Sequence, residues 1–405
     1  MVCRLCGSDR LATFVDLGAT PPCELFLTAD DLDRPEPTYP LHARVCEACL
    51  LVQLPALIDP AEIFGEYAYF SSYSTSWVEH ARRLVDVAVE RADPQLVVEV
   101  ASNDGYLLQH VLERGIRCLG IEPSANVGEA ARERGVPTVT AFLDPALAAE
   151  VRAEHGPADV VVANNVYAHI PDVRGFGEAL RTLAADDGWV VIEVQHLLTM
   201  IELGQFDTIY HEHFQYWTVG TARAALAEAG LRLVDVDLLP THGGSIRLWA
   251  RPDGTGADPT QAVADVLAGE AAAGLDTPAG YTGFAGRVSR IRNDLVRFLV
   301  EANEAGQRVA GYGAPGKGNT LLNYCGIRPD LLAYTVDMNP YKHGRFTPGT
   351  RIPIHEPEHL LADRPDVVLV LPWNLRDEIA AQLAPVREWG GRLVVAIPEL
   401  EVITP

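Results

Sequence analysis

The sequence predicts an α/β protein made of three consecutive segments, and three observations indicate this organisation. Apolar strand-like runs alternate with amphipathic helical runs in the middle of the chain and again near its end. Two Cys-x-x-Cys pairs bracket a proline-punctuated N-terminal segment. The length of 405 residues exceeds that of one typical hydrophobic core. We therefore expect domains over residues 1–60, 61–255 and 256–405.

Composition and charge exclude several classes of protein. The chain has 32 basic and 55 acidic residues, and its net charge of -23 would repel a phosphate backbone. No run approaches the roughly 18 apolar residues of a membrane span. The N-terminus lacks the apolar core of a signal peptide. We expect a cytoplasmic monomer that binds neither nucleic acid nor membrane.

The first segment, residues 1–60, has short strand-like pieces and too few core residues to fold unaided. Its two cysteine pairs are Cys3 with Cys6 and Cys46 with Cys49. Each pair can offer two thiolates to a tetrahedral zinc ion. Four thiolates leave no position open for a substrate, so the expected zinc is structural. The alternative is four free thiols, like those expected at Cys23, Cys118 and Cys325.

The pattern of the second segment predicts a sheet of five parallel strands with helices on both faces. An antiparallel pair of strands is expected to follow them. The expected strands cover residues 96–102, 117–122, 137–142, 158–165, 189–195, 232–239 and 245–252. The expected helices cover 77–92, 107–115, 126–135, 145–156, 173–188 and 221–231. Residues 256–305 are helical and alanine-rich, and a second strand–helix array follows them. Its expected strands are 308–313, 332–337, 366–373 and 392–399, and its helices are 319–326 and 376–390.

The loop EVASNDGY, residues 99–106, follows a buried strand and opens a helix, where backbone amides favour a polar or carboxylate group. Glu122 ends the next strand, placed to accept hydrogen bonds from both hydroxyls of a ribose. The loop departs from the acidic-x-G-x-G-x-G pattern of S-adenosylmethionine (SAM) methyltransferases at two positions, Ala101 and Asn103. Asparagine tolerates left-handed geometry better than most residues, so the departure is mild.

A second glycine-rich loop, GYGAPG at residues 311–316, also lies between a strand and a helix, and Asp337 ends the following strand. This arrangement matches a dinucleotide-binding fingerprint, which makes an NAD-dependent oxidoreductase acting on a nucleotide sugar the alternative function. A turn that merely needs glycines is a further possibility. Several cations come after this loop in the sequence, and their charge suits a diphosphate without singling out nicotinamide. They are Lys317, Lys342, His343 and Arg345, and Asn319 lies near Lys317 in the sequence.

Seven motifs in one order resemble the SAM-dependent sugar C-methyltransferases, which act on TDP-linked deoxysugars in antibiotic pathways. The motifs are CRLCGS, EVASNDGYLL, NNVYAHIPD, YHEHFQYW, HGGSIRLWA, GYGAPGKGNTLLNYCGI and DMNPYKHGRFTPGTRIPI. The resemblance implies an N-terminal zinc-binding domain, a central class I SAM-methyltransferase Rossmann-like domain and a C-terminal Rossmann-like domain that helps hold the nucleotide sugar. It also implies a TDP-4-keto-deoxysugar substrate, methylated next to the ketone and most often at C3.

The stretch FDTIYHEHFQYW, residues 206–217, then has a chemical role. A carbon beside a ketone reacts only after losing a proton, so the enzyme needs a base and donors for the enolate oxygen. The resemblance implies that Tyr210, Glu212 and His213 line the active site. We expect His213 to be the base, with Tyr210 and Glu212 positioning the sugar or its keto oxygen. The resemblance adds His169 as a second active-site histidine.

The remaining expected contacts are with cofactor and substrate. We expect SAM to be bound by Ser102, Asn103, Asp104, Gly105, Glu122, Asn164 and Asn165. We expect the nucleotide sugar to be bound by Tyr67, Tyr73, Lys317, Asn319, Lys342 and Arg345. The stretch 66–77, rich in tyrosine, predicts a lid over the cofactor or a packed aromatic linker.

Several alternatives remain open at this point. His211, Glu212 and His213 could bind a catalytic metal, although no third clear ligand stands out. His213 could cap the following helix, His169 could be a packed loop residue, and His211 is expected to face solvent. A binder of nucleotide sugars without catalytic activity is the third class of function.

Overall fold

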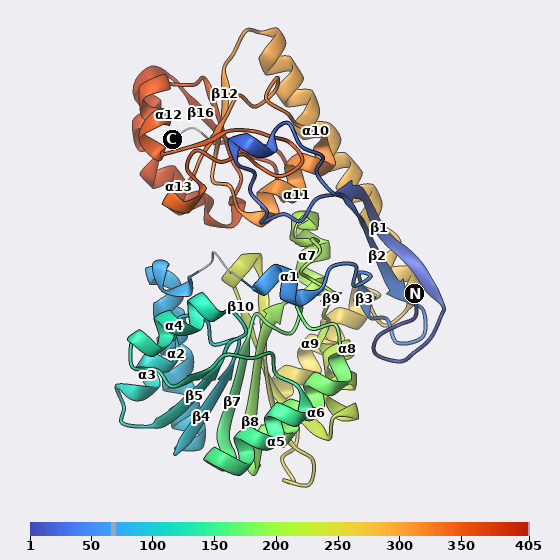
Figure 1. Ribbon diagram of the computed structural model, residues 1–405. Helices are drawn as coiled ribbons and strands as arrows, with labels where there is room; N and C mark the ends of the chain where they lie inside the picture. The colour runs from blue at the N-terminus through green and yellow to red at the C-terminus, as the bar shows by residue number, and fades with distance from the viewer. Residues whose placement is uncertain (66–69, 404–405) are drawn as a thin grey trace. The chain divides into compact units, whose positions relative to one another are not determined.

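The computed structural model describes residues 1–65 and 70–403 and divides into two compact units, each assembled from three stretches of chain (Figure 1). Unit 1 comprises Met1–Leu11, Cys46–Leu198 and Phe214–Gly280. Unit 2 comprises Ala12–Val45, Thr199–His213 and Tyr281–Pro405. The boundaries at residues 60 and 255 stay a prediction. Tyr67, expected to bind substrate, lies outside the described residues.

Unit 1 contains a seven-stranded sheet in the order β10-β11-β8-β7-β4-β5-β6. Strands β4 to β8 are parallel, β11 is antiparallel to β8, and β10 is antiparallel to β11. The predicted five parallel strands and antiparallel pair are therefore confirmed. The strands are β4 (Leu96–Val100), β5 (Arg117–Ile121), β6 (Thr138–Val139), β7 (Ala158–Asn164), β8 (Ala184–Gln195), β10 (Leu231–Leu239) and β11 (Ser245–Pro252).

Alternate residues of a strand point to opposite faces of the sheet, and here both sets are apolar. Helices therefore cover both faces. On β7, Val161 and Ala163 belong to one buried cluster, and Val160 and Val162 belong to the other. The first cluster includes residues of α5 (Pro145–His155), α6 (Val173–Leu183), α8 (Val219–Glu228) and α9 (Gln261–Ala272). The second includes residues of α2 (Thr75–Ala92), α3 (Leu108–Leu112) and α4 (Ala125–Glu133).

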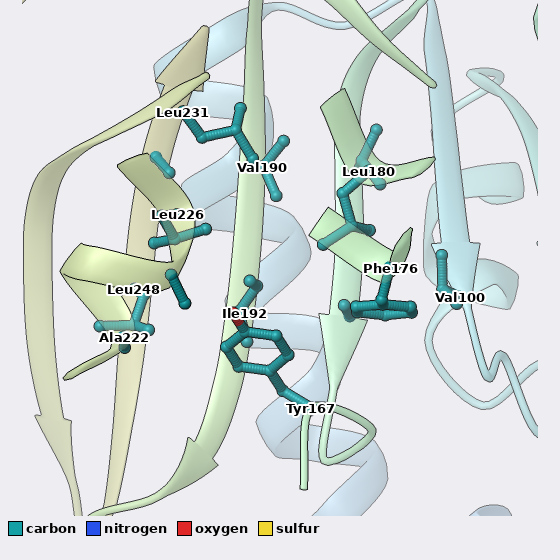
Figure 2. Close-up of a cluster of buried hydrophobic side chains, with 14 of the residues drawn as sticks. Val100, Tyr167, Phe176, Leu180, Val190, Ile192, Ala222, Leu226, Leu231 and Leu248 are labelled. Carbon is teal, nitrogen blue, oxygen red and sulfur yellow. The ribbon is translucent and has the colours of Figure 1, made fainter. Parts of the chain in front are cut away.

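Figure 2 shows part of the first cluster, in which Phe176 and Leu180 of α6 lie near Ile192 and Val190 of β8. Tyr167 lies beyond the end of β7, fully buried, and its ring stacks on Trp217 with centroids 4.3 Å apart. Both faces are thus buried in apolar contacts, and the polar residues of interest are left to the carboxyl edge of the strands.

Unit 2 contains a six-stranded sheet in the order β14-β13-β12-β15-β16-β17, parallel except for β17. The strands are β12 (Val309–Tyr312), β13 (Thr335–Val336), β14 (Ile354–His355), β15 (Val367–Val370), β16 (Arg392–Val395) and β17 (Glu401–Ile403). The helices in this part of the chain are α10 (Phe284–Glu304), α11 (Gly316–Cys325), α12 (Pro357–Asp363) and α13 (Arg376–Gln382). The second predicted strand–helix array is confirmed.

The remaining elements are short or join these arrays. They are β1 (Leu11–Thr20), β2 (Tyr39–Cys46), β3 (Val52–Gln53), α1 (Pro60–Phe64), α7 (Leu197–Leu203) and β9 (Gln215–Tyr216). β1 neighbours β2, and β3 pairs antiparallel with β9. None of the helices among the described residues is long and apolar enough to cross a membrane.

Three local features differ from the sequence predictions. The helix expected over 376–390 is an α-helix only as far as Gln382, and a 3-10 helix follows it over Ala384–Trp389. The strand β1 was not expected, because its buried positions follow no regular alternation: Phe14, Val15, Leu17 and Thr20 are buried. The helix expected over 173–188 ends at Leu183, and Ala184 starts β8. Ala184 pairs with Ala158 across a register shift, so strand pairing overrides the helical preference of the alanines.

Candidate active site and metal centre

The four cysteines predicted to bind zinc converge within unit 1. The Sγ atoms of Cys3, Cys6, Cys46 and Cys49 all lie within 4.8 Å of one another. The closest pairs are Cys3 with Cys49 at 3.5 Å and Cys6 with Cys46 at 3.6 Å. The hydrogen bond with the Cys49 thiol lowers the pKa of Cys3 to about 4. Four sulfurs at these distances fit the tetrahedron that a structural zinc ion requires.

The loop after β4 contains three residues with left-handed backbone geometry, although only one of them is a glycine. Ala101, Asn103 and Gly105 all have positive φ, at 55°, 49° and 78°. Added to Gly105, a Cβ atom would lie 2.8 Å from Val136 Cγ2, so only glycine fits there. These three left-handed residues turn the chain around the carboxyl end of β4, as in a nucleotide-binding loop.

Glu122 organises this loop from the end of β5. Its Oε2 accepts a hydrogen bond from the backbone N–H of Asn103, and its Oε1 accepts one from that of Ser124, both at 2.9 Å. Burial raises the pKa of the Glu122 carboxyl. Each oxygen retains one lone pair, so the carboxylate can still accept the two hydroxyls of a ribose.

Two asparagines at the end of β7 have amide groups available for a ligand. Asn164 is buried, and its side-chain oxygen and nitrogen have no hydrogen-bond partner among the described residues. Asn165 is left-handed, with φ at 53°, and its Nδ2 likewise has no partner within the described part of the chain. Buried amides are costly to leave unpaired, so this edge fits a polar cofactor such as SAM.

The segment before α2 binds the same loop. The backbone N–H of Ser71 donates to Asn103 Oδ1 at 2.8 Å, and the Ser72 hydroxyl donates to Asp104. Asp104 is fully buried and also forms an ion pair with Arg134 at 2.8 Å. Asn103 and Asp104 therefore fix the cofactor loop to the linker that follows residue 69.

Other predicted residues of unit 1 have different surroundings. Tyr73 is 75% exposed and its ring stacks on Phe70. His169 follows β7, and its ring packs edge-on against Phe64 with centroids 5.5 Å apart. The expected roles of Tyr73 and His169 stay predictions.

The predicted base lies in unit 2, in the turn that follows the 3-10 helix η3 (Phe206–Thr208). His213 Nδ1 lies 2.8 Å from the backbone oxygen of Thr208. Because a carbonyl can only accept, Nδ1 must carry a proton, and neutral His213 therefore has its lone pair on Nε2. The ring packs against Tyr210, with centroids 4.0 Å apart.

Glu212 is buried beside other acidic groups. Burial raises the pKa of its carboxyl to about 8, and the nearby charge of Glu24 adds to this effect. The same environment raises the pKa of the Cys23 thiol, mainly through burial. At neutral pH the Glu212 carboxyl therefore holds its proton and can donate a hydrogen bond.

The expectation that His211 faces solvent was wrong. Its side chain is buried, and its Nε2 lies 3.1 Å from the backbone oxygen of Tyr39. Burial lowers the pKa of His211, so the ring is neutral and structural. Among the described residues, the only group with metal-ligating geometry is the four cysteines, so the stretch of histidines forms no such cluster.

The second glycine-rich loop is filled by the chain itself. A Cβ on Gly316 would lie 2.7 Å from Glu24 Oε1 and 2.9 Å from Cys23 Sγ, and one on Gly313 would lie 2.6 Å from Pro372. Asp337 accepts the backbone N–H of Ala314 at 2.6 Å. The glycines thus allow close packing, as expected for a turn that merely needs glycines. A dinucleotide bound at this loop would have to displace these contacts.

The cations around this loop are engaged to different degrees. Lys317 Nζ donates to Asn374 Oδ1, and Lys342 Nζ donates to the Ala314 oxygen, both at 2.8 Å. The Arg345 guanidinium lies over the Tyr341 ring, 4.9 Å from its centroid, and makes no hydrogen bond with another described side chain. The expected contacts of Lys317, Lys342 and Arg345 with the nucleotide sugar stay predictions.

Asn319 is fully buried and donates to the backbone oxygen of Cys23 at 2.7 Å. In this conformation it holds the segment that carries Cys23 and Glu24, and the expected contact with substrate stays a prediction. The expectation that Cys23 is a buried thiol is confirmed. Glu24 was not singled out, because a single polar residue in a proline-rich loop gives no periodic signal. Asp207 was also missed, although it stands inside the stretch that drew attention to His213.

Family models divide the chain in the way these features suggest. A zinc binding domain model matches residues 3–64, a methyltransferase domain model matches 76–236, and a C-methyltransferase C-terminal domain model matches 240–398. The curated protein C-methyltransferase NovU of Streptomyces niveus is 38% identical over 99% of this chain and 96% of its own.

Solved structures give weaker matches. An O-methyltransferase family protein from Burkholderia thailandensis is 19% identical with a TM-score of 0.35, covering 45% of this chain and 59% of that one. An O-methyltransferase from Nostoc punctiforme is 18% identical with a TM-score of 0.34, covering 44% and 58%. These scores are low, so the assignment rests on the family models and the curated relative.

The fold and the domain models define a SAM-dependent methyltransferase with a structural zinc site. The chain belongs to the C-methyltransferase family, over essentially its whole length. SAM and zinc are accordingly its cofactors.

Proposed function

We propose that the protein transfers a methyl group to a carbon next to the ketone of a TDP-linked 4-keto-deoxysugar, with His213 as the base. The expected pathway is deoxysugar biosynthesis for an antibiotic, in the cytoplasm. Membership of the C-methyltransferase family indicates that the methyl group is transferred to a carbon atom. A carbon next to a ketone must first lose a proton, so a base is needed. A hydrogen beside a ketone is removed only when a base accepts it and the developing enolate is stabilised.

The observation that carries the proposal is the hydrogen bond from His213 Nδ1 to the Thr208 oxygen. In the neutral ring, this bond places the proton on Nδ1 and the lone pair on Nε2. In the proposed step Nε2 takes the proton from the carbon, and the C–H electron pair moves into the enolate, with negative charge on the former keto oxygen. A histidine fixed in one tautomer needs no rearrangement before it accepts the proton.

Glu212 is proposed to donate to that oxygen. Its raised pKa keeps the carboxyl protonated at neutral pH, so it can offer a hydrogen bond where negative charge develops. Tyr210, which contacts the ring of His213, is proposed to hold the sugar or its keto oxygen. The bound SAM supplies an activated methyl group, and the chain has only to hold the acceptor carbon in line with it.

The nucleotide part of the substrate is proposed to bind in unit 2. Arg345 supplies a guanidinium without a hydrogen-bond partner among the described side chains, and the guanidinium lies over the ring of Tyr341, a residue that is 62% exposed. A diphosphate suits the guanidinium, because paired N–H groups match phosphate oxygens. Lys342 lies in the same loop and is a further candidate.

The experiment incubates the enzyme with SAM and a small panel of TDP-4-keto-6-deoxysugars and analyses the products by mass spectrometry and NMR. A product heavier by one methylene group, with the new methyl on carbon, would support the proposal. The ketone at C4 acidifies the hydrogens at both C3 and C5, and we expect C3. Methylation at an oxygen, or consumption of a nicotinamide cofactor in place of SAM, would overturn the proposal.

A further inference from the structure

We propose that Asp207 is a positioning residue that holds the Thr208 carbonyl, and through it His213, and that Lys317 and Trp373 hold Asp207. The inference rests on the proposed role of His213 as the base. It gives the lysine after the second glycine-rich loop a different task from the expected contact with the diphosphate.

Asp207 is a fully buried carboxylate in η3, directly before Thr208. Its Oδ2 accepts a hydrogen bond from Trp373 Nε1 at 2.7 Å. Its Oδ1 is buried and has no hydrogen-bond partner among the described residues, so Trp373 is the group that fixes the carboxylate. The carboxylate therefore ties the turn of η3 to a tryptophan that lies over 160 residues later in the chain.

Lys317 supplies the balancing charge. Its ammonium group donates to Asn374 Oδ1 at 2.8 Å and lies 5.0 Å from the centroid of the Trp373 ring. Burial lowers the pKa of Lys317, and the charge of Asp207 opposes that change. Burial raises the pKa of Asp207 to about 6, and Lys317 opposes this in turn. The two charges stabilise each other across the indole.

The same turn is also held by packing. Phe206, the residue before Asp207, meets the ring of Tyr324 in α11 edge-on, with centroids 5.1 Å apart. Thr208 Oγ1 donates to the Gln205 oxygen at 2.8 Å. The Thr208 carbonyl in this turn accepts from His213 Nδ1. Outer partners of this kind set the tautomer and the orientation of a functional histidine.

The test compares Asp207→Asn and Lys317→Met with the wild type. Asp207→Asn keeps an acceptor for Trp373 and removes the charge. We expect both variants to lower kcat by about 10-fold to 100-fold, with little change in KM for the TDP-sugar. A diphosphate ligand at Lys317 would instead show as a raised KM in Lys317→Met with kcat nearly unchanged, and that result would overturn the inference.

A matched control is available in unit 1. Trp249 Nε1 donates to Asp237 Oδ2 at 2.8 Å, so Asp237→Asn alters a similar tryptophan–aspartate bond on β10. This variant should leave kcat and KM unchanged. If Asp207→Asn does not fold, Trp373→Phe is the second variant, because it removes the Trp373–Asp207 hydrogen bond that Asp207→Asn keeps and retains an aromatic ring beside Lys317. An equal loss of kcat in the Asp237→Asn control would mean that general stability, and not positioning, explains the effect.

A second readout needs no substrate. In ¹⁵N-histidine NMR, with the His213 signal assigned by comparison with His213→Asn, the wild type should show protonated Nδ1 and unprotonated Nε2. Asp207→Asn or Trp373→Phe should reduce the population of this tautomer. An unchanged tautomer in both folded variants would contradict the inference, whether or not the proposed substrate is correct.

Discussion

His213 Nδ1 donates to the backbone oxygen of Thr208, five residues earlier in the chain, at 2.8 Å. In the neutral ring, this contact makes Nε2 the basic nitrogen. Replacing His213 by Asn removes the base and keeps a polar side chain, so turnover should fall by about 10²-fold to 10⁴-fold. SAM affinity, measured by calorimetry, should stay nearly unchanged. Turnover equal to that of the wild type would remove His213 from the role of base.

If the Glu212 carboxyl acts as a hydrogen-bond donor, the reaction rate should fall on the alkaline side of the pH–rate profile. Burial raises the pKa of its carboxyl from 4.5 to about 8, so the donor form is lost as pH rises through about 8. Glu212→Gln keeps a donor that does not titrate, and it should retain activity within about tenfold while the limb near pH 8 disappears. An unchanged alkaline limb in Glu212→Gln would show that another group causes it.

The same shift affects stability, and its sign is fixed by linkage. The folded chain holds the Glu212 proton more tightly than the unfolded chain, so this group contributes stability fully below the ordinary pKa of 4.5. That contribution is lost as pH rises through about 8. Denaturant unfolding between pH 5 and pH 9 should show a shallower decline for Glu212→Gln than for the wild type, and parallel curves would contradict the assigned protonation.

The sequence predicted the parts of the fold that depend on periodicity. Strands such as Leu96–Val100 and Ala158–Asn164 are buried on both faces, so their sequences are mostly apolar, with Glu99 and Asp159 among the exceptions. The four cysteines were predictable because their spacing reflects ligand geometry. The partition into two units was not, because it depends on contacts between stretches far apart in the chain, such as Asn319 with Cys23.

The candidate site was predictable in its short motifs and not in its support. His213 and Glu212 stand in an unusual cluster of polar groups. The burial of His211 and the partner of Asp207, Trp373, depend on tertiary packing that no local pattern encodes. The same reason explains why the glycines near residue 316 suggested a dinucleotide, although they accommodate Glu24 and Cys23.

Gly105 in the cofactor loop predicts a defect in SAM binding. Gly105→Ala would force a side chain into a left-handed position and against Val136, so SAM affinity should fall at least about tenfold. Gly115 is the matched control, because its φ is +72° and no atom lies within 4 Å of an added Cβ. Gly115→Ala should lower stability by roughly 1–2 kcal/mol and leave SAM affinity unchanged. Equal affinities in both variants would contradict the placement of the cofactor.

The zinc site predicts one bound metal ion with a structural role. Elemental analysis should find one zinc per chain, and Cys46→Ser should lose it and unfold at a lower temperature. Cys118→Ala is the control, since Cys118 is a buried thiol outside the cluster. Retention of zinc in Cys46→Ser would contradict the four-cysteine site.

The most direct test of the central claim is the exchange of the acceptor hydrogen with solvent. The enzyme is incubated in D₂O with a TDP-4-keto-6-deoxysugar and S-adenosylhomocysteine, so that no methyl group can be transferred, and NMR follows deuterium entering next to the ketone. Wild-type enzyme should catalyse this exchange at the carbon that becomes methylated, and His213→Asn should slow it at least about 100-fold. Equal exchange by the two proteins, or no exchange above the enzyme-free rate in the wild type, would contradict a base-generated enolate at His213.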